Sequence, residues 1–183
     1  MTARYFYLSY AHSPPLAGSR PPLAGSRLNA STPDGWVREF FQDLSHAVDQ
    51  RSSADRALGP GFIDLQVSSG QEWKKTLVRA LGEAEVFVPL YSPGYLARSW
   101  PGREWTCFER RLESAGLADP LRRFAPVLWV PLPVGAEPRG LQAALDLVPI
   151  GAPEGANIAY RENGLLAMRR LQPYRKWYQL ITE

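Results

Sequence analysis

Short apolar runs that alternate with helical periodicities constrain the fold of this chain more than any other feature. Residues 86–91 begin with a nearly continuous run of β-branched and aromatic side chains, which is typical of a strand covered on both faces of a parallel sheet. Further strand-like runs occupy residues 4–10, 61–65 and 125–130. Strands that alternate with helices in this way predict an α/β fold with a doubly wound, mostly parallel sheet and helices on both of its faces.

The segments between these runs have the periodicity of amphipathic helices. Residues 34–50 place apolar side chains three or four positions apart, which predicts a helix. Ser69 and Glu72 have the spacing of a capping box, which predicts the start of a second helix. Pro101 suits the first position of a third helix, because its missing N–H costs nothing there. Near the end of the chain, Pro173 must kink or restart a helical pattern.

Length and composition predict one domain that spans residues 1–183. With 183 residues and 45% hydrophobic content, the chain can bury one good core. The heptapeptide PPLAGSR occurs twice in tandem, at 14–20 and 21–27, within a stretch rich in proline, glycine and serine. We interpret residues 13–33 as a loop insertion. Because the sequence stops inside an amphipathic pattern at 181–183, we expect a domain that is truncated at its C-terminus.

Composition argues against several classes of function. The net charge of +3 comes from arginines scattered among acids, whereas nucleic-acid binding normally requires a concentrated basic stripe. No apolar run approaches the length of a membrane span, and nothing resembles a signal peptide. The lone Cys107 cannot form an intrachain disulfide, and we expect it to be a buried structural thiol. These features favour a cytoplasmic protein that binds neither nucleic acid nor membrane.

Common catalytic motifs do not occur in the sequence. His12, His46 and Cys107 lack the spacing of metal ligands, and no glycine-rich phosphate loop follows the first strand. A Gly-x-Ser-x-Gly nucleophile elbow is also missing. The sequence therefore predicts chemistry without a metal.

One acid stands out because aromatic residues flank it beyond the end of a buried strand. The strand at 86–91 breaks at Ser92 and Pro93, and Glu104 follows near the start of the next predicted helix. Carboxyl ends of parallel strands commonly carry ligand sites, and a carboxylate there can stabilise positive charge. Acids are also common near helix starts because the helix dipole favours them, so local sequence leaves both interpretations open.

Three sequence boxes, taken in order, resemble those of Toll/interleukin-1 receptor (TIR) domains. The resemblance covers residues 4–130, and each box alone is weak. The amino-acid sequence of residues 100–105, together with that of 160–178, most resembles actinobacterial TIR-like proteins of the FxsC type. The boxes are Phe6-Tyr7-Leu8-Ser9-Tyr10; Gly61-Phe62-Ile63-Asp64 with Ser69-Gly70-x-x-Trp73; and Ser92-Pro93-x-Tyr95-Leu96-x-x-Ser99-Trp100-x-x-x-Glu104.

The resemblance implies a flavodoxin-like fold and a site that consumes NAD⁺ as a substrate, without a cofactor. Glu104 matches the catalytic glutamate of NAD-consuming members. Glu109 is a rival, because Trp105 precedes it at the same Trp-to-Glu spacing. We expect Glu104 to face a cleft bordered by Tyr10, Asp64 and Trp100. The full set of implied substrate-binding residues is Ser9, Tyr10, Ala11, His12, Asp64, Ser69, Gly70, Ser99 and Trp100.

Two functions follow from the resemblance and stay open at this point. The first is an NAD⁺ glycohydrolase or cyclase that acts in signalling or defence when the chain self-associates or meets other TIR domains. The second is a non-catalytic TIR module that binds partner proteins. Two departures bear on the choice: Pro101 occupies a position where many members have cysteine, and the first loop is enlarged by the PPLAGSR duplication.

Overall fold

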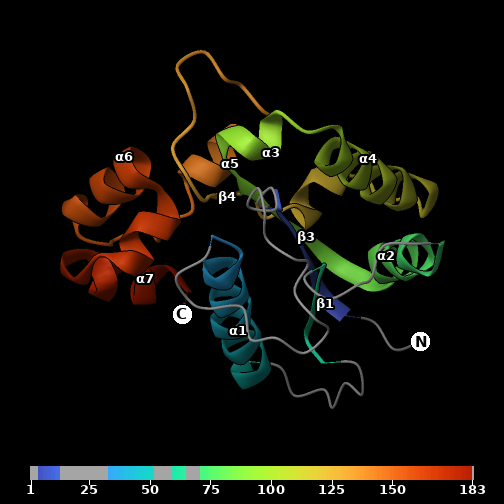
Figure 1. The fold of residues 1–183 in the computed structure, drawn as a ribbon, viewed down its shortest axis with the longest axis horizontal. Coiled ribbons are helices and arrows are strands. Elements are labelled where there is room, and N and C mark those ends of the chain that lie inside the picture. Colours follow the sequence, from blue (N-terminus) through green and yellow to red (C-terminus); the bar gives the residue numbers. More distant parts are fainter. Residues whose placement is uncertain (1–3, 13–32, 52–58, 65–70, 183) are drawn as a thin grey trace, which may run out of the picture.

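A four-stranded parallel sheet organises the computed structural model, which describes residues 4–12, 33–51, 59–64 and 71–182 (Figure 1). The strand order is β2-β1-β3-β4, and every neighbouring pair is parallel. This arrangement confirms the predicted doubly wound α/β fold and has the strand order of flavodoxin-like proteins. The strands are β1 (Arg4–Ser9), β2 (Gly61–Ile63), β3 (Ala84–Tyr91) and β4 (Val127–Leu128).

Helices connect the strands where helical periodicity predicts them. The first two crossovers are α1 (Pro33–Arg51) and α2 (Gln71–Glu83). After β3 come the short helix α3 (Pro93–Leu96), α4 (Ser99–Ser114) and a 3₁₀ turn at Pro120–Arg123. Beyond β4 the chain is helical: α5 (Leu141–Leu145), α6 (Glu154–Arg170), a 3₁₀ turn at Gln172–Tyr174 and α7 (Arg175–Thr182).

The sheet separates two apolar cores because successive strand residues point to opposite faces. Phe6 and Leu8 of β1 pack with α1, α6 and α7, whereas Tyr7 packs with α2 and α4 on the other side. Figure 1 shows the same division, with α1, α6 and α7 to one side and α2 and α4 to the other. Every second residue of β1 therefore faces α4, and this decides which side chains reach the site.

Helix α6 covers the open edge of β4. The Tyr160 hydroxyl accepts a hydrogen bond from the Leu128 N–H (2.8 Å) and donates one to the Ala144 carbonyl (2.7 Å). The Leu166 N–H donates to the Trp129 carbonyl (3.1 Å), and Gly164 interrupts the helix there with φ 74° and ψ 165°. Backbone groups of an edge strand need such partners when they are buried.

Several details differ from the sequence predictions. The run 125–130 contains only the two-residue strand β4, preceded by an isolated bridge between Phe87 and Phe124. Helix α4 begins at Ser99, so Pro101 is its third residue and not its first. Cys107 is exposed, which corrects the expected buried thiol, because the buried stripe of α4 runs through Pro101, Glu104, Trp105, Phe108 and Leu112.

Other predictions have different outcomes. The 3₁₀ turn around Pro173 precedes a new helix at Arg175, so the predicted restart is confirmed. Most of the proposed insertion, residues 13–32, and the turn residues Ser69 and Gly70 lie outside the described residues. Among the helices that the structure describes, none combines the length and the apolar character needed to cross a membrane.

A buried carboxylate at the edge of the sheet

Glu104 lies in α4 with its carboxylate turned toward the carboxyl end of β1. The Tyr7 hydroxyl and the Trp100 indole N–H donate to Oε1 at 2.7 and 2.8 Å, and the Ser9 hydroxyl donates to Oε2 at 2.5 Å. Because Ser9 gives its only hydrogen to Glu104, the Tyr95 hydroxyl, 3.1 Å away, must donate to Ser9. From the residues that the structure describes, the carboxylate thus accepts three neutral hydrogen bonds, which leaves one acceptor position on Oε2 without a described partner.

Local structure explains why these donors converge. Tyr7 and Ser9 are two positions apart on β1, so both face α4. The Tyr7 ring lies between Phe62 and Phe87, with ring centroids 5.4 and 5.7 Å away. Tyr95 is oriented by α3, whose N-cap Ser92 accepts the Tyr95 backbone N–H. Trp100 is one helical turn before Glu104 in α4, which places both side chains on the same face.

The environment of Glu104 is unusual for an acid. The residue is 5% exposed and interrupts the apolar stripe by which α4 packs on the sheet. Within the described ranges, it forms no ion pair with a lysine, arginine or histidine. Burial raises the pKa of Glu104 above its ordinary value, although the hydrogen bonds from Ser9, Tyr7 and Trp100 oppose the rise.

A second carboxylate, Asp64, follows β2 at the same edge of the sheet. Its Oδ2 accepts the indole N–H of Trp73 (2.9 Å) and lies 3.5 Å from Nε2 of His12. The other ring nitrogen of His12 is hydrogen-bonded to the Tyr10 hydroxyl at 2.9 Å. Asp64 is 8% exposed, and its negative charge adds to the rise in the pKa of Glu104. Two carboxylates therefore face this edge, each held by a tryptophan.

The edge at which they meet is the topological switch point of the sheet. Strand order reverses between β1 and β3, and Ser9, the last residue of β1, pairs with Pro89 near the end of β3 at Tyr91. Open α/β sheets bind ligands outside the carboxyl ends of their strands at such a point. The position of Glu104 beside Ser9 thus coincides with the usual ligand site of this architecture.

The structure distributes the predicted site residues unequally. Ser9 and Trp100 contact Glu104 directly, and Asp64 lies nearby. Ala11 is partly buried against the α2 and α4 side, within reach of Gly94. The Tyr10 ring packs in the core on the α1 side, and Ser99 is exposed beside Arg103 on α4. Glu104 itself is buried, where we had expected it to open into a cleft.

The two acids that were rivals in the sequence have different surroundings. Glu109 forms an ion pair with Arg139 at 2.7 Å, away from the contacts of Glu104. Sequence analysis did not single out Tyr7 or Tyr95 as members of the site. The two-residue period of β1 could have indicated Tyr7, because it shares a face with Ser9. No local pattern indicates that Tyr95 reaches Ser9.

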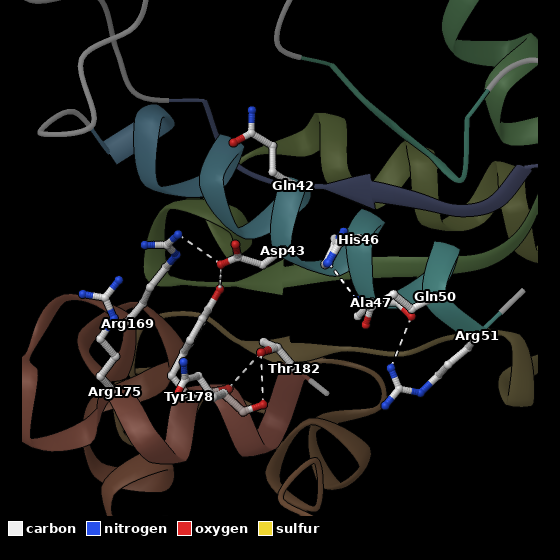
Figure 2. A pocket seen from close by; sticks show the side chains of 11 residues that line it. Gln42, Asp43, His46, Ala47, Gln50, Arg51, Arg169, Arg175, Tyr178 and Thr182 are labelled. Atoms are coloured by element: carbon white, nitrogen blue, oxygen red, sulfur yellow. Dashed lines mark hydrogen bonds and ion pairs between the residues drawn. The ribbon is translucent and has the colours of Figure 1, made fainter.

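A hollow of the described surface lies away from Glu104, on the α1 side of the sheet. A groove of about 690 Å³ runs between α1 and α7, and Figure 2 shows Asp43 directed toward Arg169 and Tyr178 inside it. Arg169 pairs with Glu39 (2.6 Å) and Asp43 (3.0 Å), and the Tyr178 hydroxyl donates to Asp43 (2.6 Å). These contacts join α1, α6 and α7 through one guanidinium that two carboxylates share.

Comparisons of the sequence with protein-family models and with curated proteins find no match. In the described ranges, no group of three or more histidine, cysteine, aspartate or glutamate side chains could hold a metal ion.

Proposed function

We propose that the chain is a TIR-type NAD⁺ glycohydrolase or cyclase in which Glu104 stabilises the reacting ribose. One observation carries the proposal: an acid is buried at the switch point of the sheet, and no lysine, arginine or histidine of the described ranges forms an ion pair with it. Burying a carboxylate costs free energy, and structural acids usually recover it from an opposite charge. The donors that Glu104 has among the described residues are all neutral, so they leave its negative charge uncancelled for a cationic ligand.

Cleavage of the nicotinamide–ribose bond needs such a charge. When the bond between ribose C1′ and the ring nitrogen breaks, its electron pair leaves with neutral nicotinamide and the ribosyl group becomes oxocarbenium-like. A preorganised carboxylate against that centre lowers the barrier. In hydrolysis, water then adds to C1′ and releases a proton, giving ADP-ribose; in cyclisation, a nitrogen of the adenine of the same NAD⁺ adds in its place.

Each neighbour of Glu104 has a role in this proposal. Ser9 and Tyr7 hold the carboxylate in one orientation while leaving one acceptor position on Oε2, which suits a ribose hydroxyl. Trp100 is partly exposed and offers the face of its ring to the substrate. Self-association or contact with other TIR domains would complete the substrate site.

A non-catalytic interaction module is the competing proposal. Its support is the same burial: with 5% exposure and three hydrogen bonds, Glu104 also fits a structural acid that fixes α4 on the sheet. The two proposals differ in what Glu104→Gln does. The amide keeps the shape and can accept from Tyr7 and Trp100 while donating to Ser9, so the fold is retained and the charge is lost.

The test is incubation of concentrated or crowded protein with NAD⁺, followed by chromatography for nicotinamide. We expect release by the wild type and a loss of about 10²-fold or more in Glu104→Gln, the size of effect seen when a group that stabilises transition-state charge is removed. Glu109→Gln is the matched control and should retain activity, because Glu109 pairs with Arg139 outside the site. No release by the wild type under any assembly condition would favour the interaction module.

A further inference from the structure

Two tryptophans from different helices connect the two carboxylates of the site. The rings of Trp73 and Trp100 have centroids 4.7 Å apart and are tilted by 30°. Each indole N–H donates to a different acid: Trp73 to Asp64 at 2.9 Å and Trp100 to Glu104 at 2.8 Å. A continuous chain of contacts therefore runs from the end of β2, through α2, to α4.

We infer that Trp73 is a positioning residue for Glu104, because its ring, anchored on Asp64, holds Trp100 in the orientation that donates to Oε1. Trp73 does not contact Glu104 itself in the described structure and acts through Trp100. Its effect on catalysis rests on the proposed function, whereas its effect on the Glu104 carboxylate does not.

Trp100 needs this support more than the other two donors do. Tyr7 and Ser9 are almost completely buried on a central strand, at 0% and 2% exposure. Trp100 is partly exposed and is only the second residue of α4, where no preceding helical turn restrains its ring. Stacking between aromatic rings contributes beyond simple burial, so the contact with Trp73 is what fixes the indole N–H on Oε1.

Trp73 is itself held in place. It is the third residue of α2, and its N–H is bonded to an acid that is 8% exposed. His12 approaches the same carboxylate oxygen at 3.5 Å. The Trp73 ring thus has one face against Trp100 and its polar edge on Asp64, which leaves it little freedom to rotate.

Loss of the Trp73 ring should change how Glu104 binds a proton. If Trp100 turns away, Oε1 keeps only the hydrogen bond from Tyr7, and a buried carboxylate with fewer donors favours its protonated form. Among the described residues, the other ionisable groups whose charge acts on this position are Tyr7, Tyr10, Tyr95 and Asp64. Burial raises the pKa of all three tyrosines, so they stay neutral while carboxyl groups titrate.

The experiment compares variants of Trp73 in protein labelled with ¹³C at the glutamate carboxyl. The Glu104 signal is assigned by its absence in Glu104→Gln, and its titration is followed by NMR. Trp73→Leu and Trp73→Met remove the ring, and Trp73→Phe restores a ring that can stack. Trp177→Leu is the matched control, because Trp177 of α7 is another partly buried tryptophan, and its ring stacks on that of Tyr174 with centroids 5.7 Å apart.

We expect the Glu104 titration to move to higher pH in Trp73→Leu and Trp73→Met, to return toward the wild-type midpoint in Trp73→Phe, and to stay unchanged in Trp177→Leu. NAD⁺ cleavage should fall about 10- to 100-fold in kcat/KM without the ring, the scale expected when a catalytic group is displaced. An unchanged midpoint in whichever ring-less variant folds would overturn the inference. A shifted midpoint in a protein that never cleaves NAD⁺ would overturn the proposed function and leave the positioning role intact.

Discussion

Replacing Tyr160 with phenylalanine removes one hydroxyl that two buried backbone groups share. The Leu128 N–H and the Ala144 carbonyl both bond to it, and all three residues are at most 3% exposed. A buried polar group without a partner costs about 1–3 kcal/mol, so the two together cost about 2–6 kcal/mol. Typical domains are stable by about 5–15 kcal/mol, and this one contact would account for a large part of that.

The free energy of unfolding in urea, followed by circular dichroism, measures the loss. Even the lower bound of about 2 kcal/mol should lower the melting temperature by about 4–8 °C in a chain of this size. Tyr174→Phe is the matched control, since no hydrogen bond of the Tyr174 hydroxyl to another described residue is seen. A loss below about 1 kcal/mol in Tyr160→Phe would refute the idea that α6 closes the edge of β4 through this side chain.

Three further predictions concern stability. Gly164→Ala should lower the free energy of unfolding in urea by about 1–3 kcal/mol or more, because φ at this residue is 74° and a Cβ would lie 2.6 Å from the Trp129 carbonyl oxygen. Gly102→Ala is the control: a Cβ there has open space inside α4, so the free energy of unfolding should not fall. Arg111→Met should lower the free energy of unfolding by about 1–3 kcal/mol in the same assay, because the guanidinium donates to three carbonyls where α2 ends and β3 begins, those of residues 81, 82 and 84. The pKa of Glu104 is higher in the folded protein than in the unfolded chain, so folding favours the protonated carboxyl. The stability that this gives the wild type is complete below the unfolded-state pKa and is lost as pH rises through the folded-state pKa. Glu104→Gln does not titrate there, so its free energy of unfolding should rise relative to that of the wild type as pH increases. A wild type that instead gains on the variant with rising pH would contradict that sign.

The sequence was sufficient for the sheet because each strand is a local apolar run. The periodicity of residues 34–50 likewise matches α1 within one residue at each end. An apolar run did not predict the length of β4, because only two residues of the run 125–130 form the strand. Trp129 is apolar because it packs in the core beyond those two paired residues. Cys107 was misjudged because its burial depends on which side of α4 meets the sheet.

The site was only partly predictable, because its contacts join residues far apart in the chain. The Tyr7 and Glu104 side chains meet across 97 positions, and no local pattern encodes that pair. The resemblance to TIR domains singled out Glu104 together with Ser9 and Trp100, both of which contact it. It also singled out Tyr10, whose ring faces the opposite core. The sequence of each segment does not tell which face of a strand packs against which face of a helix.

The dependence of NAD⁺ cleavage on pH tests most directly the proposal that ionised Glu104 acts on the ribosyl centre. Nicotinamide release would be followed from pH 4 to 9 in the wild type and in Glu104→Gln. Because burial raises the pKa of Glu104, we expect the wild-type rate to fall on the acid side around a midpoint above the ordinary value of a glutamate, and the variant to be slow and to lack this limb. Equal rates with the same acid limb in both proteins would contradict a role for the Glu104 charge.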